Sequence, residues 1–271
     1  MMANPGRRQA KPVLARYIKV MRRNDDRRDA AAAPAVPAGS RIYAIGDVHG
    51  RLDLLTRLHA LIAADAADMP ARRQVIVYLG DYIDRGPDSR GVIELLLQPP
   101  RSGFEHVHLF GNHEDFLLQF LEHPEVGPHW CAYGGMATLA SYGVQPPSSF
   151  TPRAADFETA RRALADKLPS AHVGFLRGLK LTHTEGGYLF VHAGVRPGVA
   201  LAEQQAEDLL WIRDEFLESP DDFGACVVHG HTIVEAPEQH TNRIAIDTGA
   251  FATGTLTALV LDGTEQRFIQ T

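Results

Sequence analysis

The feature of this sequence that most constrains its fold is one short pattern that occurs five times. Each copy is an apolar run of strand length, followed at once by glycine or histidine and a few polar residues. Such a run is typical of a strand buried inside a sheet. The five polar clusters are Gly46–Gly50, Gly80–Pro87, Gly111–Glu114, His192–Gly194 and His229–Thr232. Because open α/β sheets bind ligands beyond the carboxyl ends of their strands, the clusters predict one site built from five loops.

The first three copies are each followed by apolar residues at helical spacing, so strand, loop and helix repeat three times. This order predicts parallel βαβ units. After a stretch without strand signals, the last third returns to strands, which suggest a second, mostly antiparallel or mixed sheet. The later strands are expected at 188–191, 226–228, 243–246 and 255–261, with a helix at 202–218.

The predicted fold class is therefore a layered α/β protein, in which two facing sheets are flanked by helices. With 45% hydrophobic residues, the chain can build a sizeable core. We expect a single domain over 41–271. Within it, 124–185 should form a helical cap that covers the site and shapes substrate access, including a regular helix at 154–168.

The first 40 residues differ from the rest in charge and composition. They hold nine Lys and Arg against three Asp, a formal charge of +6, and the remainder holds 18 against 30, or −12. An acidic body argues against nucleic-acid binding and suits divalent cations. Residues 1–40 are predicted to be a poorly ordered basic tail. Apolar residues at helical spacing over 13–21 also allow a basic amphipathic helix that contacts a membrane surface or an acidic partner.

Features that the sequence lacks limit the cellular compartment and the kind of metal site that can be expected. Its two cysteines suggest neither a disulfide framework nor a thiolate metal site. Its apolar runs are too short for a transmembrane helix, and no signal-peptide pattern opens the chain, so a cytoplasmic protein is expected.

The five clusters contribute a set of oxygen and imidazole donors without a thiolate. These candidate ligands are Asp47, His49, Asp81, Asn112, His192 and His231. The set suits Mn, with Fe, Zn, Co or Ni as alternatives. Six ligands are too many for one tetrahedral ion and natural for two, which lie ~3.5–4 Å apart in two-metal sites, often bridged by one carboxylate. Asp81, central in order, is the expected bridge.

Two such ions lower the pKa of bound water and hold the oxygens of an in-line displacement at phosphorus. Phosphate also needs forked cationic donors, which Arg85 and Arg213 can supply. A leaving alkoxide needs a proton. His113 is placed to donate it, and Asp84 could hold His113 in its charged form.

The motifs Gly-Asp-Val-His-Gly at 46–50, Gly-Asp-Tyr-Ile-Asp-Arg-Gly at 80–86 and Gly-Asn-His-Glu at 111–114 resemble the PPP family of metallophosphoesterases. That family includes serine/threonine protein phosphatases and bacterial diadenosine tetraphosphatases. His192-Ala193-Gly194 and Gly230-His231-Thr232 match its two later histidine motifs, and the resemblance covers about 41–262. It implies the calcineurin-like metallophosphoesterase fold, a β-sandwich flanked by helices.

The resemblance also implies roles for the matching positions. Asp47 and His49 would bind one metal ion, and Asn112, His192 and His231 the other, with Asp81 between them. His113 paired with Asp84 would be the general acid. Arg85 would bind the phosphate beside Asn112. Arg213 would bind it as well, although the sequence around Arg213 is less distinctive.

The sequence Tyr82-Ile83-Asp84-Arg85 resembles the protein-phosphatase branch, close to the small bacterial and phage enzymes. This implies hydrolysis of phosphoserine and phosphothreonine in proteins, or of small phosphoesters, by in-line attack of a hydroxide that bridges the two metal ions. The alternative is a diadenosine tetraphosphatase-like hydrolase of dinucleoside polyphosphates. In that case the cap would bind a nucleoside, with Trp130 and Tyr133 as stacking candidates, although core packing is the commoner role of such residues.

Four further features near the motifs favour structural roles. Glu114 should support the start of a helix, and His229 should be a hydrogen-bonded core residue. Gly134-Gly135 should permit a tight turn, or alternatively a close backbone approach to substrate. Asp247 is equally compatible with support of a ligand and with a turn.

Overall fold

The computed structural model describes residues 33–67, 73–100, 102–147 and 152–271. Residues 1–32 of the basic segment, with the candidate helix at 13–21, lie outside the described residues. In the part that is described, no helix is long and apolar enough to cross a membrane. The folded body begins at Pro34 rather than Arg41. Val36 is buried, its N–H donates to Gly263 at 3.0 Å, and the Tyr188 hydroxyl donates to the Pro34 carbonyl at 3.1 Å.

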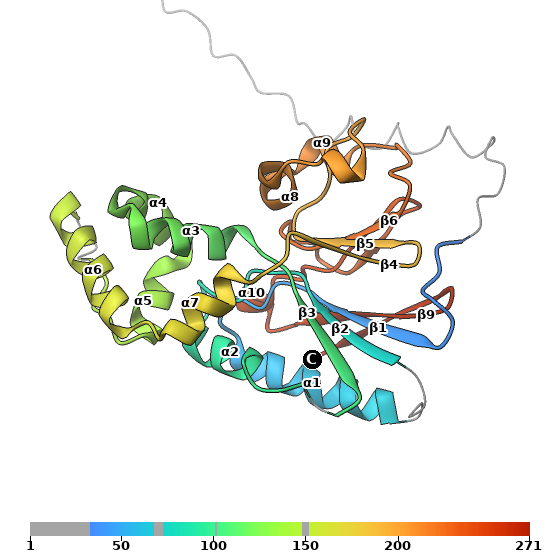
Figure 1. Ribbon diagram of the computed structural model, residues 1–271, viewed down its shortest axis with the longest axis horizontal. Coiled ribbons are helices and arrows are strands. Elements are labelled where there is room, and N and C mark those ends of the chain that lie inside the picture. Colours follow the sequence, from blue (N-terminus) through green and yellow to red (C-terminus); the bar gives the residue numbers. More distant parts are fainter. Residues whose placement is uncertain (1–32, 68–72, 101, 148–151) are drawn as a thin grey trace, which may run out of the picture. The chain divides into compact units, whose positions relative to one another are not determined.

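The first sheet has the strand order β10-β9-β1-β2-β3 (Figure 1). Its three parallel strands β1, β2 and β3 carry the first three motif copies, and β9 and β10 add an antiparallel edge. In register, Ile42 of β1 lies opposite Val75 of β2 and Leu261 of β9. The bounds are β1 Ser40–Ile45, β2 Arg73–Tyr78, β3 Phe104–His108, β9 Thr257–Asp262 and β10 Glu265–Gln270.

The second sheet has the order β4-β5-β6-β8-β7. Its middle strands β5, β6 and β8 are parallel, and β4 and β7 pair antiparallel at its two edges, so it is the mixed sheet that was predicted. The bounds are β4 Thr182–Glu185, β5 Tyr188–Val191, β6 Cys226–His229, β7 Glu238–Gln239 and β8 Arg243–Ala245.

The sheets pack face to face with helices outside, which confirms the predicted architecture (Figure 1). Successive residues of a strand point to opposite faces. Ile42 and Ala44 of β1 therefore join the core between the sheets, whereas Tyr43 and Ile45 join the core beneath α1 (Leu52–Ala67) and α2 (Ser89–Leu96). On the far side, α8 (Ala206–Trp211) and α9 (Asp214–Leu217) cover the outer face of the second sheet.

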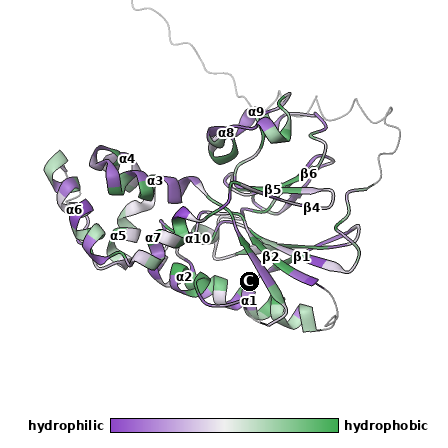
Figure 2. Cartoon of the chain, in the orientation of Figure 1, coloured by the Kyte–Doolittle hydropathy of each residue, from purple (hydrophilic) through white to green (hydrophobic). Residues whose placement is uncertain are grey.

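A group of helices between the two sheets in sequence forms the predicted cap. It follows α3 (Asn112–Glu122), the helix of the third strand–loop–helix unit, and consists of η2 Pro124–Val126, α4 Gly127–Trp130, η3 Cys131–Gly135, α5 Met136–Ser141, α6 Ala154–Lys167 and α7 Ser170–Arg177. Hydrophilic and hydrophobic stretches alternate along α6 in Figure 2, as expected of a helix with one buried face. The remaining short helices are η4 Leu201–Glu203 and α10 Ala250–Thr253.

Three features of the fold differ from the sequence prediction: the end of the cap, the sheet to which one strand belongs, and the continuity of one helix. The cap ends with α7, because Thr182–Glu185 is strand β4 of the second sheet. The predicted strand at 255–261 pairs with β1 and so belongs to the first sheet. The predicted helix at 202–218 is broken: Ile212 has ψ 142° and Arg213 has φ −132° and ψ −104°, which are not helical angles. Sheet partners are set by distant residues, so local patterns could not reveal them.

Candidate metal centre

The two sheets bring the five predicted clusters together at the carboxyl ends of their strands. His192 follows β5, and its Nδ1 lies 3.0 Å from the carbonyl oxygen of Leu79 at the end of β2. His231 follows β6, and its backbone N–H donates to the carboxylate of Asp47, beyond β1, at 3.0 Å. These contacts join the ends of both sheets into a single site, as the repeated pattern predicts.

The backbone of this site is strained. Within the described chain, the non-glycine residues with left-handed φ, between 46° and 71°, are His49, Asp81, Asp84, Arg85 and His231. All five belong to the predicted clusters. The left-handed conformation costs roughly 1–2 kcal/mol per residue. It persists where surrounding contacts over-determine it, and such positions concentrate at functional sites.

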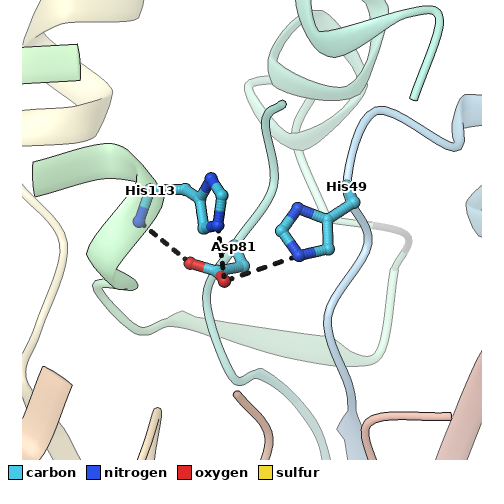
Figure 3. Close-up of side chains that lie close together, drawn as sticks. All are labelled: His49, Asp81 and His113. Carbon is cyan, nitrogen blue, oxygen red and sulfur yellow. Dashed lines mark hydrogen bonds and ion pairs between the residues drawn. The ribbon is translucent and has the colours of Figure 1, made fainter. Parts of the chain in front are cut away.

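The carboxylate of Asp81 lies at the centre of the site, with imidazoles on both sides. Its Oδ2 is 3.6 Å from Nε2 of His49 and 3.8 Å from Nε2 of His113. Its Oδ1 is 3.4 Å from Nε2 of His192. Figure 3 shows His49 and His113 pointing at Asp81 from two different chain segments. Each oxygen of Asp81 thus faces a separate group of donors, which is the arrangement expected of a bridging carboxylate.

Two of these imidazoles, His49 and His192, present lone pairs and not N–H groups to this carboxylate. His49 Nδ1 lies 2.8 Å from the Ile83 carbonyl, and a carbonyl only accepts, so the ring proton is on Nδ1 and the lone pair on Nε2. The Leu79 carbonyl orients His192 in the same way. Nε2 of His49 is buried without a hydrogen-bond partner. Lone pairs that face a carboxylate repel it unless a cation lies between them, so these donors fit a metal ion.

A second group of donors meets on the other side of Asp81. The Oδ1 of Asn112 is 2.8 Å from Nε2 of His192 and 2.9 Å from Nδ1 of His231. An amide oxygen accepts only, and Nε2 of His192 carries a lone pair because Nδ1 donates to Leu79, so two acceptor atoms face each other here as well. In the described residues, two sets of carboxylate and imidazole groups are close enough to hold an ion: His49 with Asp81 and His113, and Asp81 with His192 and His231.

Burial and neighbouring charges together shift the pKa values of the candidate ligands. Burial lowers the pKa of His49 to about 3 and lowers that of His192, so both rings are neutral. Burial alone would raise the pKa of Asp81, but the surrounding histidines hold it below its usual range. The pKa of Asp47 is well above its usual range because of burial and the negative charges of Asp247 and Asp81. A bound cation would offset this crowding of carboxylates.

Glu114 supports the strained Asp81 loop. Its fully buried carboxylate accepts the backbone N–H groups of Asp81 at 2.9 Å, Tyr82 at 2.8 Å and Gly111 at 3.1 Å, with a longer contact to Ile83 at 3.3 Å. The sequence analysis favoured a structural role for Glu114 at the start of α3. The contacts extend that role to the loop that carries Asp81.

His113 and Asp84 form a buried pair beside the centre. His113 Nδ1 donates to Asp84 Oδ2 at 2.7 Å, which leaves Nε2 facing the site. Burial opposes protonation of His113, but Asp81 and Asp84 together raise its pKa above the ordinary value. Nε2 also lies 3.1 Å from Nη2 of Arg85, and a guanidinium repels a metal ion. A guanidinium only donates, so Nε2 accepts from Arg85 in this arrangement, and His113 can carry a proton on Nε2 only when Arg85 moves away.

The two predicted phosphate-binding arginines lie differently. The Arg85 guanidinium contacts His113 and lies 4.8 Å above the ring of Phe251, a cation–π contact that orients it. Arg213 is exposed, and its Nη1 donates to the His231 carbonyl at 3.3 Å and to the Thr232 hydroxyl at 3.1 Å. The helix break between α8 and α9 lies at Arg213 itself. It places Arg213 beside His231, one of the candidate ligands.

Sequence reasoning missed several residues that contact the site. Trp130 and Thr138 donate to the carboxylate of Asp84, and Phe251 packs on Arg85. Trp130 is fully buried, so of its two expected roles the structure favours core packing over stacking on a base. His229 is also fully buried, as expected of a core histidine. Periodicity identifies a buried aromatic residue, but it cannot say where the indole N–H points.

The family relationship agrees with this geometry. A family model described as calcineurin-like phosphoesterase matches residues 40–250. The chain therefore belongs to the calcineurin-like phosphoesterase family and is a metal-dependent hydrolase of phosphoric esters, as the sequence motifs predicted.

Relatives with different activities resemble the chain over similar lengths. It is 27% identical over 224 residues to serine/threonine-protein phosphatase 2 of Salmonella typhimurium, covering 79% of this chain and 90% of that protein. It is 25% identical over 232 residues to the asymmetrical bis(5'-nucleosyl)-tetraphosphatase PrpE of Anoxybacillus flavithermus, covering 79% and 88%. A solved structure of a provisionally described diadenosine tetraphosphatase has a TM-score of 0.58 at 20% identity, covering 88% and 98%, and shares the fold.

Proposed function

We propose that this protein is a two-metal phosphomonoesterase that acts on phosphoserine and phosphothreonine. The observation that carries the proposal is the His113–Asp84 pair, with its 2.7 Å hydrogen bond, next to the carboxylate of Asp81. This pair is a proton donor held at the edge of the metal centre. A substrate whose leaving oxygen needs a proton is the one that benefits from it.

Two divalent ions, with Mn as the first choice, would be held by the donors of the five clusters. Asp47 and His49 would bind one ion, Asn112, His192 and His231 the other, and Asp81 both. When bound, such ions lower the pKa of water and hold the oxygens of an in-line displacement at phosphorus. The convergence of lone pairs on both sides of Asp81 supports this assignment.

The chain's own residues would bind the phosphate and supply the proton. The guanidinium of Arg85 offers forked donors to phosphate oxygens, and Arg213 offers a second set at the rim. A phosphate that binds Arg85 would draw it away from Nε2 of His113. That nitrogen would then be free to hold the proton and give it to the leaving oxygen, while Asp84 keeps the ring oriented.

The acidity of the leaving group favours a serine or threonine ester. A serine or threonine oxygen leaves as an alkoxide, whose conjugate acid is about as weak as water, with a pKa of about 15.7. A nucleotide leaves as a phosphate, whose second pKa is about 6. The alkoxide needs a proton and the phosphate does not. A buried, carboxylate-supported histidine is therefore expected in an enzyme for alkyl monoesters.

Hydrolysis of dinucleoside polyphosphates is the second candidate. The relative from Anoxybacillus flavithermus is named a tetraphosphatase and aligns with 79% of this chain. Tyr133 is 48% exposed, and its backbone carbonyl oxygen lies 3.4 Å from Nε of Arg85, so this residue adjoins the proposed phosphate-binding arginine. An exposed aromatic ring in that place could stack on a base.

The test is a paired assay on metal-stripped protein reconstituted with Mn. The kcat/KM for phosphate release from a phosphothreonine peptide is compared with that for cleavage of diadenosine tetraphosphate. We expect the peptide to be preferred, and a large preference for the dinucleotide would overturn the proposal. Asp81→Asn should abolish both activities and serves as the control for contaminating enzymes. Parallel reconstitution with Zn, Fe, Co and Ni tests the choice of metal. The cytoplasmic location stays a prediction.

A further inference from the structure

We propose that the helical cap holds the acid pair in place, with Trp130 and Thr138 as positioning residues for Asp84. The sequence suggested a cap that covers the site and shapes substrate access. The contacts point to a different task, because the segment from α4 to α5 bonds directly to Asp84 and to the backbone of Arg85. The inference rests on the proposed acid role of His113.

Three donors hold the side chain of Asp84. Oδ2 accepts His113 Nδ1–H at 2.7 Å and the indole Nε1–H of Trp130 at 2.8 Å, and Oδ1 accepts the hydroxyl of Thr138 at 2.6 Å. Asp84 is fully buried, so water does not replace a missing donor. Two of the three donors come from the cap. They fix the plane of the carboxylate, and with it the direction in which His113 is held.

The same segment holds the strained backbone of the loop. Asp84 N–H lies 2.9 Å from the Thr138 hydroxyl and 3.0 Å from that of Ser89, and Arg85 N–H donates to the Gly134 carbonyl at 3.2 Å. Asp84 and Arg85 have left-handed φ values of 71° and 66°. Gly134 has φ 114°, and a Cβ there would lie 2.7 Å from Arg85 N. Only glycine allows this close approach.

A purely structural role for Trp130 is the competing explanation. Its ring packs on Phe120 with centroids 4.9 Å apart, and a Cβ on Gly135 would lie 2.5 Å from it. Loss of the ring would therefore destabilise the cap whatever the indole N–H does. Thr138 separates the two roles more cleanly, because valine has the same shape and removes only the hydroxyl.

The two roles make different predictions about the leaving group. If Thr138 positions the acid pair, its loss weakens proton donation and slows hydrolysis of an alkyl phosphate. An aryl phosphate such as p-nitrophenyl phosphate has a far more acidic leaving group and needs little proton donation. A structural role would lower both rates by the same factor.

The experiment measures kcat/KM on a phosphothreonine peptide and on p-nitrophenyl phosphate for the Mn-loaded full chain. Thr138→Val is expected to lose about tenfold on the peptide, part of the 10²–10⁴ that general acid–base catalysis contributes. It should lose less than about twofold on the aryl ester. Thr138→Ser, which keeps a hydroxyl, should restore the ratio of the two rates. Leu139→Ala removes packing from the neighbouring buried residue and should not change that ratio. Equal losses on both substrates in Thr138→Val would overturn the inference.

A second measurement does not depend on activity. The Nδ1 proton of His113 is expected as a downfield NMR resonance, assigned by its absence in His113→Gln. In Thr138→Val and Trp130→Phe it should move upfield or broaden through exchange with water, because the Asp84 hydrogen bond is less constrained. An unchanged resonance in both variants would refute the positioning role. Failure of the wild type to hydrolyse either ester would instead count against the proposed function.

Discussion

The carboxylate of Glu114 offers a direct test of what holds the Asp81 loop in its strained conformation. Its Oε2 accepts the N–H groups of Asp81 and Gly111, and its Oε1 accepts those of Tyr82 and Ile83. All four N–H groups belong to the two loops that carry the central candidate ligands. The side chain is fully buried, so no solvent can take its place.

Glu114→Gln keeps the shape of the side chain but turns one of the two oxygens into an NH₂ group. Two of the four backbone N–H groups then face a donor. An unsatisfied buried donor costs about 1–3 kcal/mol, so with two of them we expect the free energy of unfolding to fall by about 2–6 kcal/mol. Affinity for Mn should fall as well, because Asp81 would no longer be held in its left-handed conformation.

The assay is urea unfolding of the metal-free protein, followed by calorimetric titration with Mn. Asp115→Asn is the matched control. It makes the same change of charge in the first turn of α3, where Asp115 is less buried and bonds Gln119. Both variants lose the helix-dipole contribution of about 0.3–1 kcal/mol. The reasoning would be refuted if Glu114→Gln destabilised the protein no more than Asp115→Asn does.

Three other predictions follow from the same contacts. Asp81→Asn should abolish tight binding of both ions in a Mn titration while the protein stays folded by circular dichroism; two intact sites would contradict a bridge. Arg213→Ala should lower kcat/KM on phosphate esters about 10–100-fold, as expected for loss of a charged hydrogen bond worth about 1.5–3 kcal/mol; a change below twofold would remove it from the site. Burial lowers the pKa of His59 to about 4 and that of His108 to about 3, so the unfolded chain binds protons more readily and stability falls as pH drops below about 6.5. Each histidine should cost about 2 kcal/mol at pH 5, and His108→Gln should reduce the difference in urea stability between pH 7 and pH 5 by that amount; an unchanged difference would show that His108 is not responsible.

Local patterns in the sequence were sufficient to predict most of the architecture around the site. An apolar run that ends in glycine and a polar cluster predicts a buried strand and the residues at its end. This reasoning located β1, β2, β3, β5 and β6 together with all six candidate ligands. Helical spacing located α1, α2, α3 and α6, and the helix predicted at 154–168 extends one residue beyond the end of α6. Both signals depend only on near neighbours in the chain, so no tertiary information was needed.

The tertiary structure decided the features that depend on residues far apart in sequence. Only the fold shows that β9 pairs with β1, that Glu114 bonds the Asp81 loop, and that Trp130 directs its N–H at Asp84, 46 positions away. A hydrophobic pattern reports that a side chain is buried, but not the direction of its one polar atom. That direction depends on how the cap packs against the strand ends. The sequence by itself therefore determined which residues could form the metal centre, and the fold decided which residues hold them there.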